Sequence, residues 1–282
     1  TPGTIIDEKA GHAKQYYYLT SVVADGDQFG FAYTDLSTGE MKVSQIASLD
    51  LLLNEMLSLQ TKEVVINHGV ASEVVHAFVQ QQILVSYQED GDATAEVSFV
   101  SQNISQPLEL AVIKQLVLYL ATTQKRHLGH LQRAQEYEPS QYLKLDHSAK
   151  MNLELTASLR TGHKSGTLLW LLDETKTAMG GRLLKQWLER PLLDLKAIQN
   201  RQRQVASFMN HYFERTNLQD ALTKVYDLER LAGRVAFGSV NGRDLIQLKT
   251  SLEQIPTIKT ILTGINDDQT FDRALDQLDP VD

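Results

Sequence analysis

The sequence contains no cysteine, which excludes disulfides, thiolate zinc sites, iron–sulfur clusters and a cysteine nucleophile. Proline and glycine are scarce, with 6 and 16 among 282 residues, which excludes a collagen-like or broadly disordered chain. The longest apolar stretch, 110–121, is interrupted by Lys114 and Gln115 and falls short of the roughly 20 residues of a membrane-spanning helix. The first 14 residues lack the apolar core of a signal peptide. These absences predict a folded protein of the reducing cytoplasm.

Length and charge predict two different domains. The chain has 282 residues, and 42% of them are hydrophobic, which suits two domains of ordinary size. Residues 1–138 contain 8 Lys and Arg against 17 Asp and Glu, whereas residues 139–282 contain 19 against 18. The acidic first half is therefore a poor candidate for binding a phosphate backbone by itself. Because the sequence begins with Thr1 and has no initiating Met, we expect it to be part of a longer protein.

The first half has the pattern of an α/β domain. Asp25-Gly26-Asp27-Gln28 separates two runs rich in Tyr, Val and Phe, which is the turn chemistry of a β-hairpin. We expect strands at 16–24, 29–34, 41–46, 64–66 and 83–87, with helices between the later ones capped by Ser48 and Ser72. Short apolar strands that alternate with helices indicate a partly parallel sheet with helices on its faces.

The second half has the pattern of an all-helical domain. Residues 91–106 are too polar to assign, Pro107 opens an apolar helix to Thr123, and 124–141 is a polar, basic stretch that ends in a linker at Pro139-Ser140. Beyond Leu143 the apolar residues recur every three or four positions. We expect helix caps at Asp173, Asp194, Asp227 and Asn241.

Three groups of residues are candidates for chemistry. Four carboxylates near the first hairpin could bind metal ions as in a ribonuclease H-type nuclease: Asp25, Asp27, Asp35 and Glu40. All four also lie at predicted turns, where Asp is favoured because its side chain forms hydrogen bonds with the nearby backbone. Gly162-His163-Lys164-Ser165-Gly166-Thr167 lacks the spacing and the preceding strand of a phosphate-binding loop, so a helix-connecting loop is expected. His127 and His130 are three residues apart without a third ligand.

Arginines and lysines of the second half could contact phosphate groups. On predicted helices such residues usually form the solvated face, where the nearby acidic residues Asp227, Glu229 and Asp244 can pair with them. The cations concerned are Arg182, Lys185, Arg190, Arg230, Arg234 and Arg243.

Several strings resemble the MutS family of bacterial DNA mismatch repair proteins. In the second half these are Gly166 to Asp173, Thr177 to Leu184 and Asp227 to Leu231, which resemble the core domain of the family. In the first half Phe29 to Tyr33 and Asp35 to Glu40 resemble its connector domain, and Thr1 to Thr4 resembles the segment that leaves its mismatch-reading domain. The strings occur in the family's order along nearly the whole chain.

The resemblance implies a linker at 1–10, a ribonuclease H-like connector domain at 11–138 and the N-terminal helical part of the core at 139–282. The family's F-x-E wedge, Walker A loop and DNA clamp are absent from this sequence. We therefore expect no catalytic, cofactor or metal residues, and no enzymatic activity, in the chain itself. In the parent, the resemblance implies a homodimer that binds mismatched duplex DNA, ATP with Mg and the partner MutL. A metal-dependent nuclease and an unrelated protein-interaction module remain the alternatives.

Overall fold

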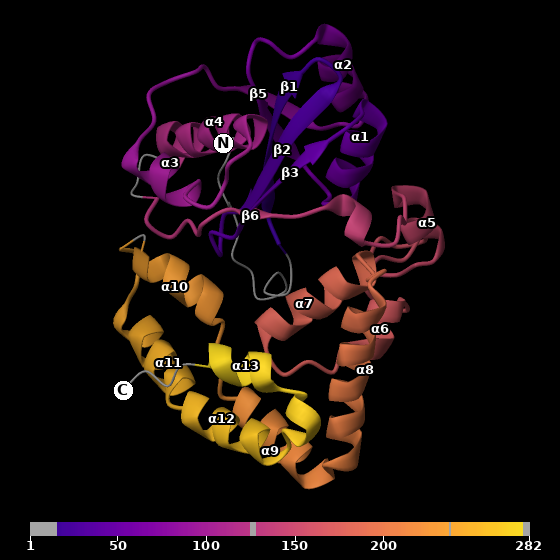
Figure 1. Cartoon of the computed structure of the whole chain (residues 1–282), viewed down its shortest axis with the longest axis vertical. Helices are drawn as coiled ribbons and strands as arrows, with labels where there is room; N and C mark the ends of the chain where they lie inside the picture. Colours follow the sequence, from indigo (N-terminus) through magenta and orange to yellow (C-terminus); the bar gives the residue numbers. More distant parts are fainter. Residues whose placement is uncertain (1–15, 125–127, 237, 279–282) are drawn as a thin grey trace. The chain divides into compact units, whose positions relative to one another are not determined.

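The computed structural model describes residues 16–124, 128–236 and 238–278 (Figure 1). The chain divides into a first unit, made of Thr1–Ser140, Leu145–Asn152 and Ala232–Ser239, and a second unit, made of Gln141–Lys144, Leu153–Leu231 and Val240–Asp282. The first unit is a mixed sheet with helices, and the second is helical. This confirms the predicted combination of an α/β part and an all-helical part.

The sheet of the first unit begins with the predicted hairpin. Strands β1 (Tyr18–Asp25) and β2 (Gln28–Asp35) pair antiparallel, and β3 (Met41–Ile46) pairs antiparallel with β2. The remaining strands, β4 (Glu63–Ile66), β5 (Leu84–Tyr87) and β6 (Gln135–Glu136), pair parallel with their neighbours. The order across the sheet is β5-β4-β1-β2-β3-β6.

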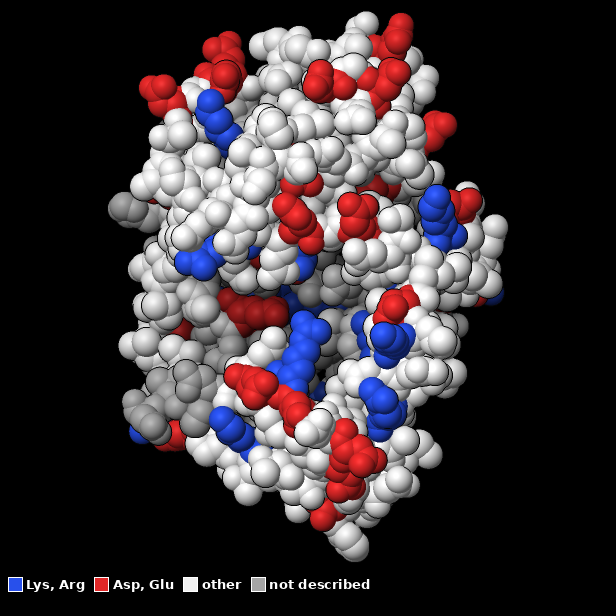
Figure 2. Space-filling view, viewed as in Figure 1, with Lys and Arg blue, Asp and Glu red and all other residues white. Residues whose placement is uncertain are grey.

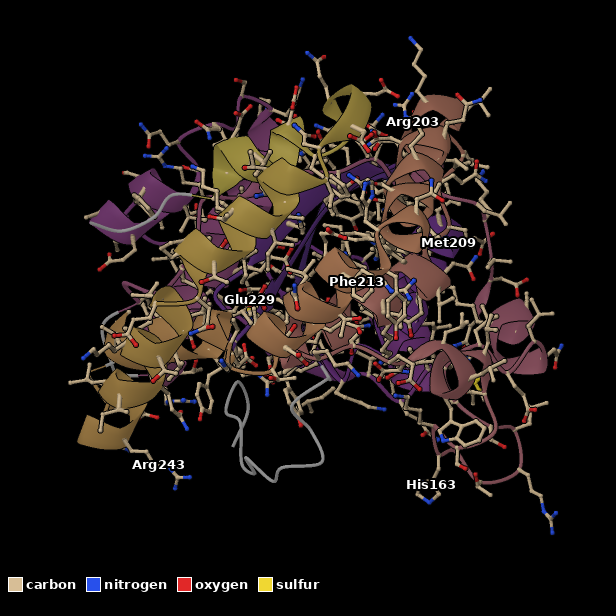
Figure 3. All side chains as sticks on the ribbon, turned by 90° about the horizontal axis from the view of Figure 1, so that it is seen from below. His163, Arg203, Met209, Phe213, Glu229 and Arg243 are labelled. Atoms are coloured by element: carbon tan, nitrogen blue, oxygen red, sulfur yellow. The ribbon has the colours of Figure 1, made fainter. Side chains whose placement is uncertain are left out.

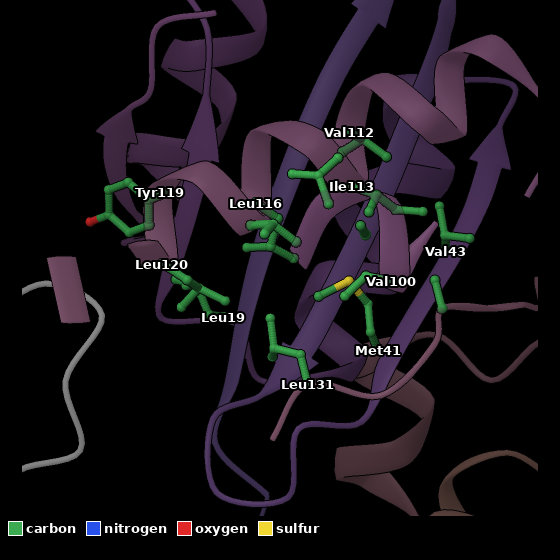
Figure 4. Close-up of a cluster of buried hydrophobic side chains, with 14 of the residues drawn as sticks. Leu19, Met41, Val43, Val100, Val112, Ile113, Leu116, Tyr119, Leu120 and Leu131 are labelled. Atoms are coloured by element: carbon green, nitrogen blue, oxygen red, sulfur yellow. The ribbon is translucent and has the colours of Figure 1, made fainter. Parts of the chain in front are cut away.

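Helices cover both faces of this sheet, which explains why β2 is buried from Phe29 to Asp35. One face packs against α1 (Leu49–Ser58) and α2 (Ser72–Gln80). The other packs against α3 (Ala95–Val100) and α4 (Pro107–Gln124), where Ile113 and Leu116 of α4 share one buried cluster with Met41 and Val43 of β3 (Figure 4).

Two glycines permit close backbone approaches within the first unit. Gly39 has a positive φ of 71°, and a Cβ there would lie 2.1 Å from the carbonyl oxygen of His130. A Cβ on Gly30 would lie 2.6 Å from the carbonyl oxygen of Leu108 at the start of α4. Both positions therefore exclude any larger residue without a backbone shift.

The structure corrects two expectations for the first unit and assigns one segment that we left open. Residues 91–106, which we could not assign, contain α3, with Thr94 accepting from the amide of Val97. Ser72 is the first residue of α2 rather than its cap. The polar stretch expected over 124–141 contributes β6 and three buried residues, because the polar side chains alternate with apolar ones that pack under α4: Leu128, Leu131 and Ala134.

The second unit consists of helices connected by loops, several of which cap the helix that follows. Its core is formed by α9 (Tyr212–Leu222), α12 (Ile255–Gly264) and the segment that follows, which includes Phe271. The other helices are α6 (Leu168–Leu172), α7 (Ala178–Glu189), α8 (Leu195–Asn210), α11 (Gly242–Leu252) and α13 (Asp272–Gln277). Helix α5 (His147–Asn152) belongs to the first unit, and α10 (Leu228–Ala236) is divided between the two. Short 3-10 turns lie at Pro139–Gln141 and Asp267–Gln269.

Three of the four predicted caps of this half are confirmed. Asp194 accepts from the amide of Ala197, and Asn241 forms a capping box with Asp244. Asp227 accepts from the amide of Arg230 at 3.4 Å, which is a long cap contact. Asp173 is not an N-cap, because it lies at the C-terminal end of α6 and its side chain binds Lys164 and Thr175.

Candidate functional site

A buried ion cluster connects α7 to the start of α10 within the second unit. Thr177 caps α7 through the amide of Gly180, and the helix then places Arg182 in the interior with 0% of its surface exposed. The guanidinium donates from Nη1 to Oδ2 of Asp227 at 2.6 Å and from Nη2 to Oδ1 at 2.8 Å. Nη2 also donates to Oε2 of Glu229 at 2.5 Å. The cluster thus joins residues 45 and 47 positions apart in the sequence.

The electrostatics of this cluster explain why a charged side chain is tolerated there. Burial of Arg182 disfavours its charged form, but the hydrogen bonds and charges of Asp227 and Glu229 outweigh that effect, so the pKa of the guanidinium is raised. A bidentate Arg–carboxylate pair also fixes the orientation of both side chains. The expected pairing with Asp227 and Glu229 is therefore confirmed for Arg182, but the expectation that this arginine lies on the solvated face is wrong.

The other cations of this half lie in varied surroundings. The guanidinium of Arg190 lies 5.9 Å from the ring centre of Tyr142, and Lys185 pairs with Glu189 at 3.7 Å. Arg230 approaches Asp227 at 3.9 Å, and Arg243 is exposed at the start of α11 (Figure 3). Lys185 and Arg190 come from α7 and its C-terminal cap, and Arg230 and Arg243 come from α10 and α11. Acidic or aromatic groups lie beside Lys185, Arg190 and Arg230, so these three cations do not form a dedicated phosphate site.

Asp25 and Asp27 lie too far from Asp35 and Glu40 for the four carboxylates to bind a common metal ion, whereas Glu40 lies next to Asp35 and pairs with Lys42. The register pairs Tyr18 with Asp35 at one end of the hairpin and Asp25 with Gln28 at the other. Seven residue steps at about 3.4 Å separate the two ends by roughly 24 Å. Asp27 lies in the turn beside Asp25, so it is equally remote from Asp35.

Asp35 has a structural function in the turn between β2 and β3. Its buried carboxylate accepts hydrogen bonds from the amides of Tyr17 at 2.8 Å, Ser37 at 2.7 Å and Thr38 at 3.1 Å. The Ser37 hydroxyl donates to the same carboxylate at 2.5 Å. These donors occupy the oxygens that a metal ion would need, so the geometry does not support the nuclease alternative.

The histidines provide no metal site within the described residues. No group of three or more His, Asp or Glu side chains in residues 16–124, 128–236 and 238–278 is arranged to hold an ion. His127 lies outside these ranges. His130 lies next to Gly39. Burial lowers the pKa of its imidazole to about 4, so the imidazole is neutral at physiological pH.

The segment from Gly162 to Thr167 connects two helical regions, as expected. Lys164 forms an ion pair with Asp173, and Thr167 caps α6 by accepting from the amide of Trp170 at 3.2 Å. His163 is exposed at the periphery (Figure 3). With its lysine engaged at the end of α6, the segment lacks the free cation of a phosphate-binding loop.

One carboxyl group of the first unit, which no motif in the sequence indicated, has unusual surroundings. Glu109 lies in the first turn of α4 and is buried. Burial, together with the charge and hydrogen bond of Glu136 and the charge of Glu138, raises the pKa of Glu109 to about 7. This carboxyl group is therefore about half protonated near neutral pH. Its neighbour Glu136 belongs to β6, so the pairing of β6 with β3 brings the two carboxyl groups together.

No helix among the described residues has the length and apolar character needed to cross a membrane.

Comparison with known proteins gives one consistent result. The family model described as MutS domain II matches residues 17–132, and the one described as MutS domain III matches residues 148–280. The DNA mismatch repair protein MutS of Lactobacillus johnsonii is 48% identical over 282 residues, which is 99% of this chain and 33% of the relative. MutS of Listeria monocytogenes is 47% identical over 285 residues, again 99% of this chain and 33% of the relative. The chain therefore spans about a third of the length of these curated relatives.

Proposed function

Because this chain belongs to the MutS family, we propose that it forms the central scaffold of a DNA mismatch repair protein. The observation that carries this proposal is the order of the two family matches, domain II over 17–132 and domain III over 148–280. In this role the first unit is the connector domain and the second is the N-terminal part of the core. Neither unit supplies catalytic groups. Both transmit changes between other parts of the full-length protein.

We further propose that the connector is ribonuclease H-like in fold. Three sequential antiparallel strands, followed by two strands parallel to the first and helices on both faces, support this assignment. In this assignment the carboxylates of the hairpin stabilise its turns and do not bind metal ions. The proposal accordingly assigns the unit to interaction rather than to phosphodiester cleavage.

In the full-length protein the proposed partners are mismatched duplex DNA and MutL, with ATP and Mg bound by an ATPase domain and with a second copy of the protein as dimer partner. The cytoplasm is the proposed location. The relay passes through the second unit, where Arg182, Asp227 and Glu229 hold α7 rigidly against the start of α10. Rigid helices with fixed charged contacts are suited to transmit a displacement over a distance.

The experiment uses the full-length protein that contains this segment, with Arg182→Ala compared with Arg203→Ala on the exposed surface of α8. We expect Arg182→Ala to reduce the mismatch-dependent stimulation of nucleotide exchange more than tenfold, equivalent to about 1.4 kcal/mol of coupling. The basal ATPase rate and the Arg203→Ala variant should change little. MutL capture on mismatched DNA should fall in parallel. Unchanged stimulation in a folded Arg182→Ala protein would remove this segment from the relay.

A further inference from the structure

Strand β5 leaves one side of its backbone open at the edge of the sheet. It is the terminal strand in the order β5-β4-β1-β2-β3-β6. The amide of Leu84 donates to the carbonyl of Lys62, and that of Gln88 donates to the carbonyl of Ile66, both at 2.9 Å. Because these directions alternate along a parallel strand, the amides and carbonyls of Val85 and Tyr87 point away from β4. Among the described residues, no strand or loop pairs with them.

The side chains around this edge are apolar and exposed. Leu84 is 53% exposed, Tyr87 is 48% exposed, and Val79 in the last turn of α2 is 57% exposed. The ring of Tyr87 stacks on His68 with centres 4.7 Å apart and an angle of 12° between the planes. The strand sequence Leu-Val-Ser-Tyr contains neither a charge nor a proline, the residues that commonly prevent edges from pairing. Of the features that prevent edge pairing, β5 has its short length of 4 residues.

The segment that follows β5 is strongly acidic. Glu89, Asp90 and Asp92 are all exposed, and Lys114 pairs with Asp90 at 2.7 Å. Figure 2 shows that acidic side chains outnumber basic ones over the upper part of the first unit, which contains α2 and β5 in Figure 1. A strand laid along β5 would therefore end in a region of negative potential.

We propose that the free edge of β5 binds an extended segment of another protein that alternates apolar residues with Lys or Arg. The segment adds a strand next to β5 and exchanges backbone hydrogen bonds with Val85 and Tyr87. Its apolar side chains cover Tyr87 on one face of the sheet, and its Lys or Arg side chains lie on the opposite face, which Leu84 shares. Its cations lie toward Glu89 and Asp92. A second copy of this chain fits less well, because it would bring two acidic units together. This proposal concerns a surface that the scaffold function does not use.

The test measures the binding of a fluorescein-labelled peptide of about nine residues, long enough to exceed a typical strand, in which Val or Thr alternates with Lys. Two control peptides replace every Lys by Glu or N-methylate alternate amides. The protein variants are Leu84→Lys, which adds a charge to the edge, and Val85→Pro, which removes an amide that β4 does not use. Leu51→Lys on α1, where Leu51 is 43% exposed, is the matched control.

We expect Leu84→Lys and Val85→Pro each to weaken binding of the Lys peptide about tenfold or more, and Leu51→Lys to leave it within about twofold. Both control peptides should bind at least about tenfold more weakly than the Lys peptide. Amide shifts in the NMR spectrum should be largest at Val85 and Tyr87. Thermal melts establish that the variants are folded. If Val85→Pro does not fold, the comparison of Leu84→Lys with Leu51→Lys still decides the test.

Three outcomes would overturn the proposal. Equal binding to Leu84→Lys and Leu51→Lys would show that the edge is not used. Equal binding of the N-methylated peptide would show electrostatic adsorption without strand pairing. A concentration-dependent dimer in sedimentation that disappears in Leu84→Lys would assign the edge to a second copy of the chain.

Discussion

The carboxylate of Asp227 is expected to be far more important for stability than an ordinary aspartate, because it neutralises a buried guanidinium. Replacing Asp227 with Asn keeps the size of the side chain but leaves Arg182 with Glu229 as its remaining charged partner in this cluster. Removing one partner of a buried pair costs several kcal/mol, since the other charge stays in a poorly solvating environment. We expect Asp227→Asn to lower the free energy of unfolding of the second unit by about 3 kcal/mol.

Urea denaturation followed by circular dichroism checks this prediction. Asp220→Asn, an exposed residue on α9, is the matched control and should change the unfolding free energy by less than about 0.5 kcal/mol. Arg182→Met removes the cation of the same cluster and should cost less than Asp227→Asn, because the charges left behind, on the partly exposed Asp227 and the exposed Glu229, are better solvated than the buried guanidinium. Equal, small effects of Asp227→Asn and Asp220→Asn would contradict the burial of the pair.

Glu109 makes the stability of the first unit depend on pH. Its pKa is about 7 in the folded protein and about 4.5 ordinarily, so between these values the folded state retains a proton that the unfolded state has released. The contribution of Glu109 to stability therefore decreases as pH rises from about 4.5 to 7. We expect Glu109→Gln to be more stable than the wild type by about 2 kcal/mol at high pH, and to differ little at low pH.

Thermal or urea unfolding at about pH 5 and about pH 8, on either side of the folded pKa, measures this difference. Glu73→Gln, at an exposed position of α2, is the control and should show no such pH dependence relative to the wild type. A Glu109→Gln variant that gains nothing at the higher pH would mean that the carboxyl group is solvated or paired when ionised.

These residues also define what the sequence could predict at this scale. The turn function of Asp35 was predictable, because Asp before Ser-Thr-Gly is typical of a side chain that binds its own backbone. The burial of Arg182 was not, because helical spacing alone does not distinguish a solvated arginine from one paired with a carboxylate 45 residues away. Glu109 is similar, since its partner Glu136 lies on a strand that local sequence did not indicate.

At the scale of elements, the stability of α8 depends on contacts of partly exposed side chains rather than on fully buried residues. None of its residues is fully buried. The guanidinium of Arg201 lies 3.6 Å from the ring centre of Trp187 on α7, and Phe208 contacts Phe271 with centres 5.0 Å apart. Since cation–π contacts contribute about 1 kcal/mol when partly desolvated, we expect Arg201→Ala to lower stability by about that amount.

Arg201→Lys should fall between the wild type and Arg201→Ala, because lysine keeps the charge but not the planar stacking group. Arg203→Ala, exposed on the same helix, serves as the control. Urea unfolding followed by tryptophan fluorescence in a Trp170→Phe background reports on Trp187. If Arg203→Ala is as costly as Arg201→Ala, the effect belongs to helix propensity and not to the stacking contact.

Strong local periodicity made most elements predictable. The hairpin, β3, the short strands β4 and β5 and the apolar helix α4 follow from alternation, apolar runs, turn residues and Pro107. The elements that the sequence did not predict are short, and tertiary contacts stabilise them. Helix α3 has six residues and β6 has two, and both are held by contacts with α4 or β3 that no local pattern encodes.

At the scale of the whole chain, charge and burial separate the two units. The first half of the sequence is strongly acidic, whereas the second is nearly neutral. The second unit also exposes large apolar residues such as Met209 and Phe213 at the junction of α8 and α9 (Figure 3). The net charge of -8 limits the counterion release that this chain can supply for binding nucleic acid.

We therefore expect the isolated chain to bind duplex DNA weakly at about 150 mM salt, and equally weakly whether the duplex is matched or contains a G·T mismatch. Arg182 cannot contribute to such binding, because its guanidinium is buried and occupied by Asp227 and Glu229. Arg190→Ala should change little, since this side chain already lies beside the ring of Tyr142. Titration of both labelled duplexes by fluorescence anisotropy provides the measurement, with the full-length protein as positive control. Submicromolar binding that prefers the mismatch would require base-reading residues within this chain and would contradict its role as a scaffold.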